Sequence, residues 1–219
     1  MLQPSTFKFL KDLKKNNNKP WFDAHKTTYE TAKTDFEELV TGVLTGLGKT
    51  EPAFKELKAK DCIFRIYRDV RFSKDKTPYK SHFGASFSKG GKKHLAAGYY
   101  LHLEPGAIFM GGGMWMPEGD AVKKIRQEID YNFKDFQKIM NAAAFKKTFG
   151  KLSEEEKLKT TPKGYTDDNP AIEYLKLKSF VAGCKMDDKD LGDKNAAANC
   201  VKVFSAMKPF IDFLNKATE

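Results

Sequence analysis

The residues with the clearest chemical potential lie in one short stretch, residues 65–82, called the basic segment below. It holds six lysines or arginines and two aspartates, a local charge of +4. Guanidinium groups suit two-point capture of phosphate or carboxylate. The segment therefore predicts a site for a small ligand that carries one of these groups. We expect its ligand-binding side chains to be Arg65, Tyr67, Arg68, Arg71, Lys74, Lys76 and Lys80.

Four further side chains are candidates for acid–base or positioning roles: Asp69, Tyr79, His82 and His102. His102 lies in an alternating stretch that places it on the same face as Tyr100 and Glu104. No catalytic triad, carboxylate pair or phosphate-loop pattern accompanies these residues. The sequence therefore indicates no reaction class and no cofactor, and whether the protein is an enzyme stays open.

Two other interpretations of the basic segment stay open. In the first, Asp69 and acids on neighbouring strands pair with Arg65 and Arg71, so that the segment is an internal ion network of a structural or protein-binding module. In the second, the protein binds nucleic acid through basic residues interleaved with aromatic ones, consistent with a pI of about 9.3. Basic residues elsewhere are dispersed among acids, which makes the nucleic-acid interpretation the weaker of the two.

The spacing of histidines and cysteines does not indicate a metal centre. The histidines form neither an HExxH nor a His-x-His pattern, and the cysteines never occur as CxxC. We therefore expect no metal ligands, and reduced thiols with Cys62 as an unreactive core thiol. Spacing does not decide whether His82 and His102 meet in the fold. The residues concerned are His25, His82, His94, His102, Cys62, Cys184 and Cys200.

The elements that must position these residues follow from hydrophobic periodicity. Apolar and polar residues alternate over three stretches, which predicts strands at residues 62–72, 82–88 and 99–104. Pro105 and Gly106 fit the centre of a type II turn, after which residues 107–114 are expected to return as an antiparallel strand. Residues 73–81 read as a loop and residues 90–93 as a turn. The strands follow one another without helical crossovers, so we expect a mainly antiparallel sheet at about residues 61–114.

Helical spacing occurs before and after this sheet. Ser5 is expected to cap a first helix, which ends at the asparagine run of residues 16–18. Pro20 is expected to start a second helix that ends near residues 46–48. Helices resume after Pro117, with a break near Asn132, and Pro209 should kink or split a last helix at residues 194–216. The sequence thus predicts an α+β fold in which N-terminal and C-terminal helices pack on the sheet, in a single domain of residues 1–219.

Composition limits the class of protein. Of the 219 residues, 40% are hydrophobic and 13% aromatic, which excludes wholesale disorder. The mean hydropathy is −0.59, and no apolar run approaches the ~20 residues of a membrane span. The N-terminus carries no apolar signal-peptide core. We expect a soluble, cytoplasmic protein with a net charge of +10, and the sequence does not indicate its oligomeric state.

Residues Arg65 to Lys80 also resemble the signature of a known family, the domain-of-unknown-function family numbered 2461. They fit its Arg-Ile-Tyr-Arg-Asp-x-Arg-Phe-Ser-x-Asp-Lys-x-Pro-Tyr-Lys core without a gap. The resemblance extends over essentially the whole chain through residues 18–22, 98–103, 111–114, 163–165 and 175–180. It implies an α+β domain and no particular activity.

Overall fold

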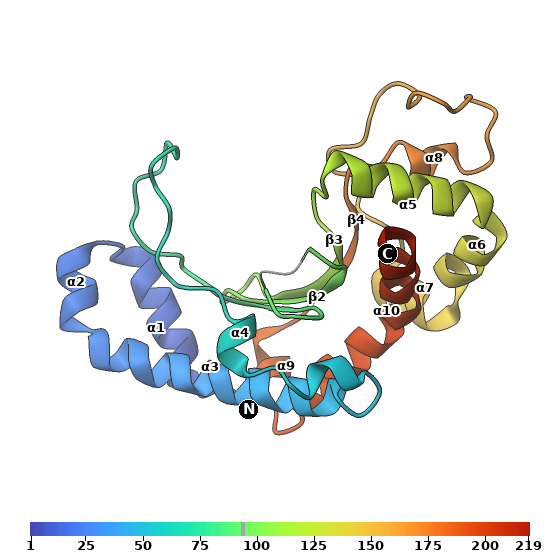
Figure 1. Ribbon diagram of the computed structural model, residues 1–219. Coiled ribbons are helices and arrows are strands. Elements are labelled where there is room, and N and C mark those ends of the chain that lie inside the picture. The colour runs from blue at the N-terminus through green and yellow to red at the C-terminus, as the bar shows by residue number, and fades with distance from the viewer. Residues whose placement is uncertain (93–94) are drawn as a thin grey trace. The chain divides into compact units, whose positions relative to one another are not determined.

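The computed structural model describes residues 1–92 and 95–219 (Figure 1). Lys93 of the expected turn and His94 lie outside the described residues. The described chain forms an α+β fold with an antiparallel sheet, as the sequence predicts. The sheet has four strands in the order β1-β2-β3-β4, of which β4 lies outside the predicted sheet region. The strands are β1 (Phe83–Phe87), β2 (Gly98–Leu103), β3 (Phe109–Met114) and β4 (Phe180–Lys185).

The chain divides into two compact units, each assembled from three separate segments. Unit 1 consists of Met1–His94, Tyr100–Met110 and Lys185–Lys202. Unit 2 consists of Leu95–Tyr99, Gly111–Cys184 and Val203–Glu219. The expectation of a single domain stays a prediction.

Unit 1 is built around two helices whose apolar faces follow helical spacing. Leu10 and Leu13 of α1 and Phe36 and Val40 of α3 are fully buried. Phe36 also stacks on Phe83 of β1 with ring centroids 5.3 Å apart. The helical elements are α1 (Pro4–Lys15), α2 (Lys19–Ala24), α3 (Lys26–Leu47), η1 (Pro52–Phe54), α4 (Ala59–Cys62), α9 (Asp188–Gly192) and the first part of α10 (Ala196–Thr218).

The ends of the first helices differ from the prediction. Helix α1 begins at Pro4, and a buried carboxylate of α3 replaces the expected Ser5 cap. Asp35 accepts hydrogen bonds from the Gln3 backbone N–H at 2.8 Å and from the Thr6 hydroxyl at 2.5 Å. The helix expected from Pro20 is two helices, because His25 leaves the helical conformation at φ −112° and ψ 20°.

The strand predicted at residues 62–72 is wrong. Helix α4 ends at Cys62, and the following chain forms only two isolated antiparallel bridges, Ile63 to Ala85 and Tyr67 to Tyr79. The bridges are four positions apart on one side and six on the other, so the pairing register shifts by two. The two extra residues lie between Tyr79 and Ala85, where the chain bends at residues 81–82, as it does at a β-bulge. Apolar alternation persists while the regular hydrogen-bond ladder is lost.

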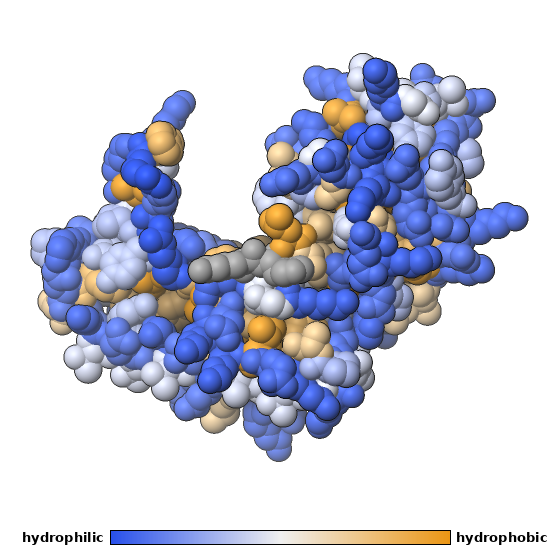
Figure 2. Space-filling model, in the orientation of Figure 1, coloured by the Kyte–Doolittle hydropathy of each residue, from blue (hydrophilic) through white to orange (hydrophobic). Residues whose placement is uncertain are grey.

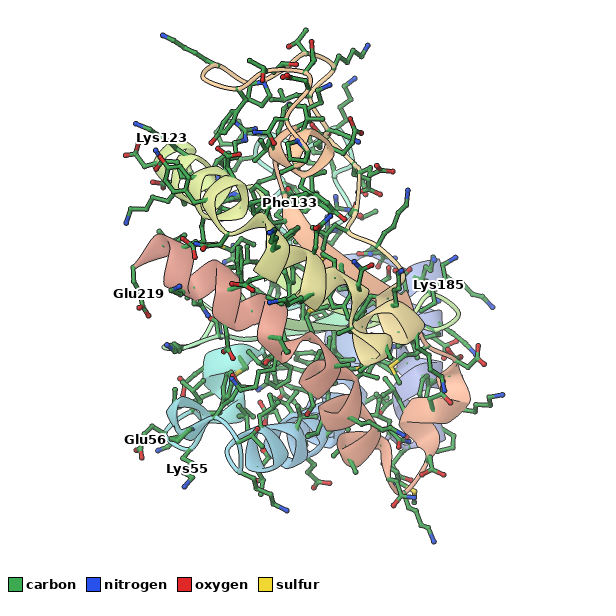
Figure 3. The ribbon with its side chains drawn as sticks, turned by 90° about the vertical axis from the view of Figure 1, so that its right-hand side faces the viewer. Lys55, Glu56, Lys123, Phe133, Lys185 and Glu219 are labelled. Atoms are coloured by element: carbon green, nitrogen blue, oxygen red, sulfur yellow. The ribbon has the colours of Figure 1, made fainter. Side chains whose placement is uncertain are left out.

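Unit 2 is predominantly helical. Helix α5 ends and α6 begins at Asn132, as the sequence predicts. Helix α10 runs through Pro209 without splitting, because its buried side chains hold it on both sides of the proline. Phe210 of α10 contacts Phe136 and Phe145 at ring-centroid distances of 6.4 and 5.9 Å. Phe133, the first residue of α6, lies where α5 passes into α6 (Figure 3). The helices are α5 (Gly119–Tyr131), α6 (Phe133–Asn141), α7 (Ala143–Phe149), α8 (Ile172–Leu175) and the remainder of α10.

The face of the molecule drawn in Figure 2 is mostly hydrophilic, with hydrophobic residues in small groups. Among the described helices, none is both long and apolar enough to cross a membrane. Cys62 is buried, and burial raises the pKa of its thiol to about 11. This agrees with the expectation of an unreactive core thiol.

In unit 2, β3 and β4 approach so closely that side chains on part of β3 are excluded. A Cβ at Gly113 would lie 2.0 Å from the carbonyl oxygen of Phe180, and the residue has φ +120°. A Cβ at Gly111 would lie 2.6 Å from the carbonyl oxygen of Ala182. Glycine at residue 113 is therefore required by both space and backbone conformation.

We expect Gly113→Ala to lower the free energy of unfolding by about 2–4 kcal/mol, because both strain and a backbone clash are introduced. At about 2–4 °C per kcal/mol, the melting temperature should fall by roughly 5–15 °C. Gly119→Ala is the matched control, since no atom lies within 4 Å of the added Cβ. Equal melting temperatures for the two variants by calorimetry would contradict the account of β3.

Candidate ligand pocket and histidine cluster

Asn17 fixes the basic segment to the N-terminal helices of unit 1. Its side-chain N–H donates to the carbonyl oxygen of Tyr79 at 2.9 Å, and its side-chain oxygen accepts from the Tyr79 N–H at 3.1 Å. Phe22 stacks on the Tyr79 ring at a centroid distance of 4.0 Å. Tyr79 is only 4% exposed, so its two backbone groups would otherwise be buried without partners.

Residues 69–77 form the tip of the basic segment, which projects from unit 1 (Figure 1, teal). Local ion pairs organise this tip. Arg68 donates to Asp75, and this bond lowers the pKa of the Asp75 carboxyl to about 2. Arg71 binds Asp69 at two points, with N···O distances of 2.9 and 2.6 Å, and thereby lowers the pKa of Asp69. Two of the predicted anion-binding arginines thus already have carboxylate partners.

The other predicted ligand-binding residues of the segment are mostly directed to solvent. Arg65 and Lys74 are exposed, and the Tyr67 side chain is 49% exposed. Lys76 donates to the Val70 carbonyl oxygen at 3.0 Å. These residues therefore lie around the segment without converging on one point.

An open pocket of about 610 Å³ lies in unit 1 against the base of the segment. It includes Arg68 and Lys80 of the predicted ligand-binding set, and Asp69, Tyr79 and His82 of the predicted acid–base set. Arg65, Tyr67, Arg71, Lys74, Lys76 and His102 do not line it. The complete lining is Lys14, Asn17, Arg68, Asp69, Asp75, Thr77, Tyr79, Lys80, Ser81 and His82. A second hollow, of about 750 Å³, lies beside α1 and α9 and contains none of the predicted residues.

Lys80 is the unusual cation of this pocket. Among the described residues, no carboxylate lies within ion-pair distance of its ammonium group, which instead sits 5.5 Å from the centre of the Phe64 ring. Burial, reinforced by the charge of Arg65, lowers the pKa of Lys80. Both causes disfavour the charged form of Lys80. An anionic ligand nearby would favour that form and so offset them.

A histidine cluster borders the pocket through His82. The rings of His82 and His102 lie 4.2 Å apart between centroids. The Nε2 atom of His102 is 3.3 Å from Glu104 Oε2, and its Nδ1 atom is 3.2 Å from the Tyr100 hydroxyl. Tyr100, His102 and Glu104 therefore share one face, as alternation predicts. One donor atom each of His82, His102 and Glu104 lie within 4.8 Å of one another.

Burial sets the charges of this cluster. It lowers the pKa of His82 to about 4, assisted by the neighbouring His102, and it also lowers the pKa of His102 against the opposing pull of Glu104. Burial alone would raise the pKa of Glu104, but hydrogen bonds from Lys14 and His102 outweigh it and lower that pKa. At neutral pH the cluster therefore holds two neutral imidazoles and one carboxylate.

Sequence reasoning missed Lys14 and Asn17. Lys14 donates to Glu104 Oε1 at 2.9 Å from the end of α1, and Asn17 follows that helix. The asparagine run at residues 16–18 is predicted only to end the helix. Asparagine in place of the usual glycine at a helix end was the available signal, because its side chain can bond to backbone groups.

The family model described as Conserved hypothetical protein (DUF2461) matches residues 5–213. The chain belongs to this family. The match extends over essentially the whole chain and confirms the resemblance carried by Arg65 to Lys80. No curated protein and no solved structure matches the chain. Because the family description specifies no activity, a function for this DUF2461 protein must be argued from the pocket itself.

We expect Asn17→Ala to destabilise unit 1 by about 2–3 kcal/mol, because two backbone groups of Tyr79 lose their partners in a buried environment. Asn16→Ala is the matched control, since Asn16 is exposed and its side chain bonds only to the adjacent helix at Asp12. Hydrogen exchange at residues 77–82 should accelerate in the first variant only. Equal exchange in both would show that Asn17 does not hold the segment.

Proposed function

We propose that this DUF2461 protein binds a small ligand carrying a phosphate or carboxylate group in the pocket at the base of the basic segment. The observation that carries the proposal is Lys80, a partly buried ammonium that lines the pocket without a carboxylate partner among the described residues. A buried cation is stabilised by an anion at short range, which supplies the selectivity for a charged ligand.

Two neighbours support Lys80 in this role. Arg68 lines the same pocket and retains donors besides those bound to Asp75. Ser81 contributes a hydroxyl that lies 3.5 Å from Glu104 Oε1, too long for a strong hydrogen bond. An ammonium, a guanidinium and a hydroxyl are a donor set suited to phosphate or carboxylate oxygens.

Thermal unfolding tests the proposal, on protein treated with a chelating resin so that no bound metal contributes to its stability. The ligands are phosphate, sulfate, nucleotides, sugar phosphates, dicarboxylates and short single-stranded oligonucleotides. A ligand at 100 times its Kd stabilises the native state by about 2.7 kcal/mol, which is roughly 5–10 °C for a chain of this size. We expect one class of small anion to produce this shift in the wild type.

Two variants of equal charge change make the test specific. Lys80→Met keeps most of the apolar stem and removes the pocket cation, so it should abolish the shift. Lys74→Met removes an exposed cation outside the pocket and should retain it. Identical shifts in both variants would refute the assignment of Lys80.

The same measurements separate the alternative functions. The tip carries Phe72, which is 95% exposed with the Arg71 guanidinium 5.7 Å from its ring centre, an arrangement suited to base stacking. A salt-sensitive shift with oligonucleotides that weakens equally in both lysine variants would favour nucleic acid. No shift with any ligand, together with early melting of Arg68→Ala, would favour a structural ion network.

A further inference from the structure

We propose that His82, His102 and Glu104 bind a divalent transition-metal ion of the zinc type. The three side chains converge from two neighbouring parts of unit 1, and their donor atoms lie within 4.8 Å of one another. Two imidazoles and one carboxylate form a donor set used by zinc in hydrolytic enzymes and by iron(II) in oxygenases. The inference does not rest on the proposed binding of an anion.

The separation between His102 and Glu104 fits two ligands of one metal. Their nearest atoms, Nε2 and Oε2, are 3.3 Å apart. A hydrogen bond from an imidazole to a carboxylate is usually about 2.7–3.0 Å long. Two ligands with metal bonds of about 2.1 Å at a tetrahedral angle stand about 3.4 Å apart. The observed distance is therefore closer to a coordination edge than to a strong hydrogen bond.

Neighbouring groups orient the two ligands on β2 and the residue after it. The Tyr100 hydroxyl lies at Nδ1 of His102, which leaves Nε2 for a metal, and Phe109 stacks on the ring at 4.7 Å. Lys14 binds Oε1 of Glu104, which leaves Oε2. Outer partners of this kind fix ring orientation and the donor atom in metalloproteins.

His82 supplies the side of the cluster that faces the pocket. The structure gives neither of its ring nitrogens a hydrogen-bond partner among the described residues, although the side chain is partly buried. Because the pocket that His82 lines is open, the lone pair of its imidazole is available to a ligand. Because His82 lines the pocket, a metal bound to it borders the pocket, where further coordination positions are accessible.

Charge and donor type select the class of metal. The cluster offers one formal negative charge, and Lys14 already binds that carboxylate. Magnesium and calcium require several oxygen ligands, whereas zinc, cobalt and iron(II) bind neutral imidazole well. Spacing rules miss this set because His102 follows His82 by twenty positions and the pairing of β1 with β2 brings the two residues together.

Cobalt(II) is the probe for this site, because its visible d–d absorption reports a protein-bound ion of low coordination number. Protein stripped with a chelating resin is titrated with Co²⁺, and Zn²⁺ is then added as a competitor. We expect one Co²⁺ per chain, displaced by one Zn²⁺, without the thiolate charge-transfer band that cysteine ligands would give. Metal content after gel filtration supplies the stoichiometry independently.

Variants identify the ligands. His82→Gln and Glu104→Gln should each weaken Co²⁺ binding at least 100-fold. Tyr100→Phe, which removes an outer partner only, should weaken it by about 10-fold. His25→Gln is the matched control, because His25 is also partly buried in unit 1 but stacks on Trp21 outside the cluster. Circular dichroism verifies that each variant folds.

Two results would overturn the proposal. One is unchanged Co²⁺ affinity in both folded ligand variants. The other is wild-type protein that retains no Co²⁺ or Zn²⁺ at micromolar concentration. If a ligand variant fails to fold, nitrogen NMR of the wild-type histidines decides the matter, since Zn²⁺ must then shift ring nitrogens of both His82 and His102. Neither result would affect the Lys80 test, which uses metal-stripped protein.

Discussion

The basic segment has a defined position because Asn17 completes the hydrogen bonding of Tyr79. In the bridge with Tyr67, the backbone groups of Tyr79 point away from the partner chain, and the flanking residues make the interchain bonds. The Asn17 side chain therefore makes the two hydrogen bonds to Tyr79 that the backbone of a neighbouring strand would make. Both Lys80 and the bend at residues 81–82 follow directly on Tyr79. The position of the pocket cation thus depends on one side-chain amide.

The charges of the segment serve two different purposes. At its tip, each acid lies close in sequence to an arginine, and exposed pairs of this kind fix loop geometry while contributing little stability. At its base, Lys80 is partly buried and lacks such a partner among the described residues. Burial rather than the number of cations therefore distinguishes the position that favours a ligand.

The alternation of apolar and polar residues predicted those strands whose burial alternates along the chain. Alternation identified β1 and β2 because these strands bury every second side chain, as Phe83, Ala85 and Phe87 show. It misassigned residues 62–72, because burial alternates there although the register shift interrupts the ladder. It did not predict β4, a short strand far from the others in sequence. Lys14 and Asn17 were missed because partners distant in sequence leave no periodic signal.

The division into two units has a consequence for biosynthesis. Unit 1 requires residues as late as Lys202, and unit 2 requires residues as early as Leu95. Neither unit corresponds to a continuous stretch, so no single cut of the gene yields either one intact. A ribosome must have released the residues up to Lys202 before unit 1 can close its core. Until then, the apolar faces of α1 and α3 are incompletely buried, and these exposed faces are the surface that chaperones bind.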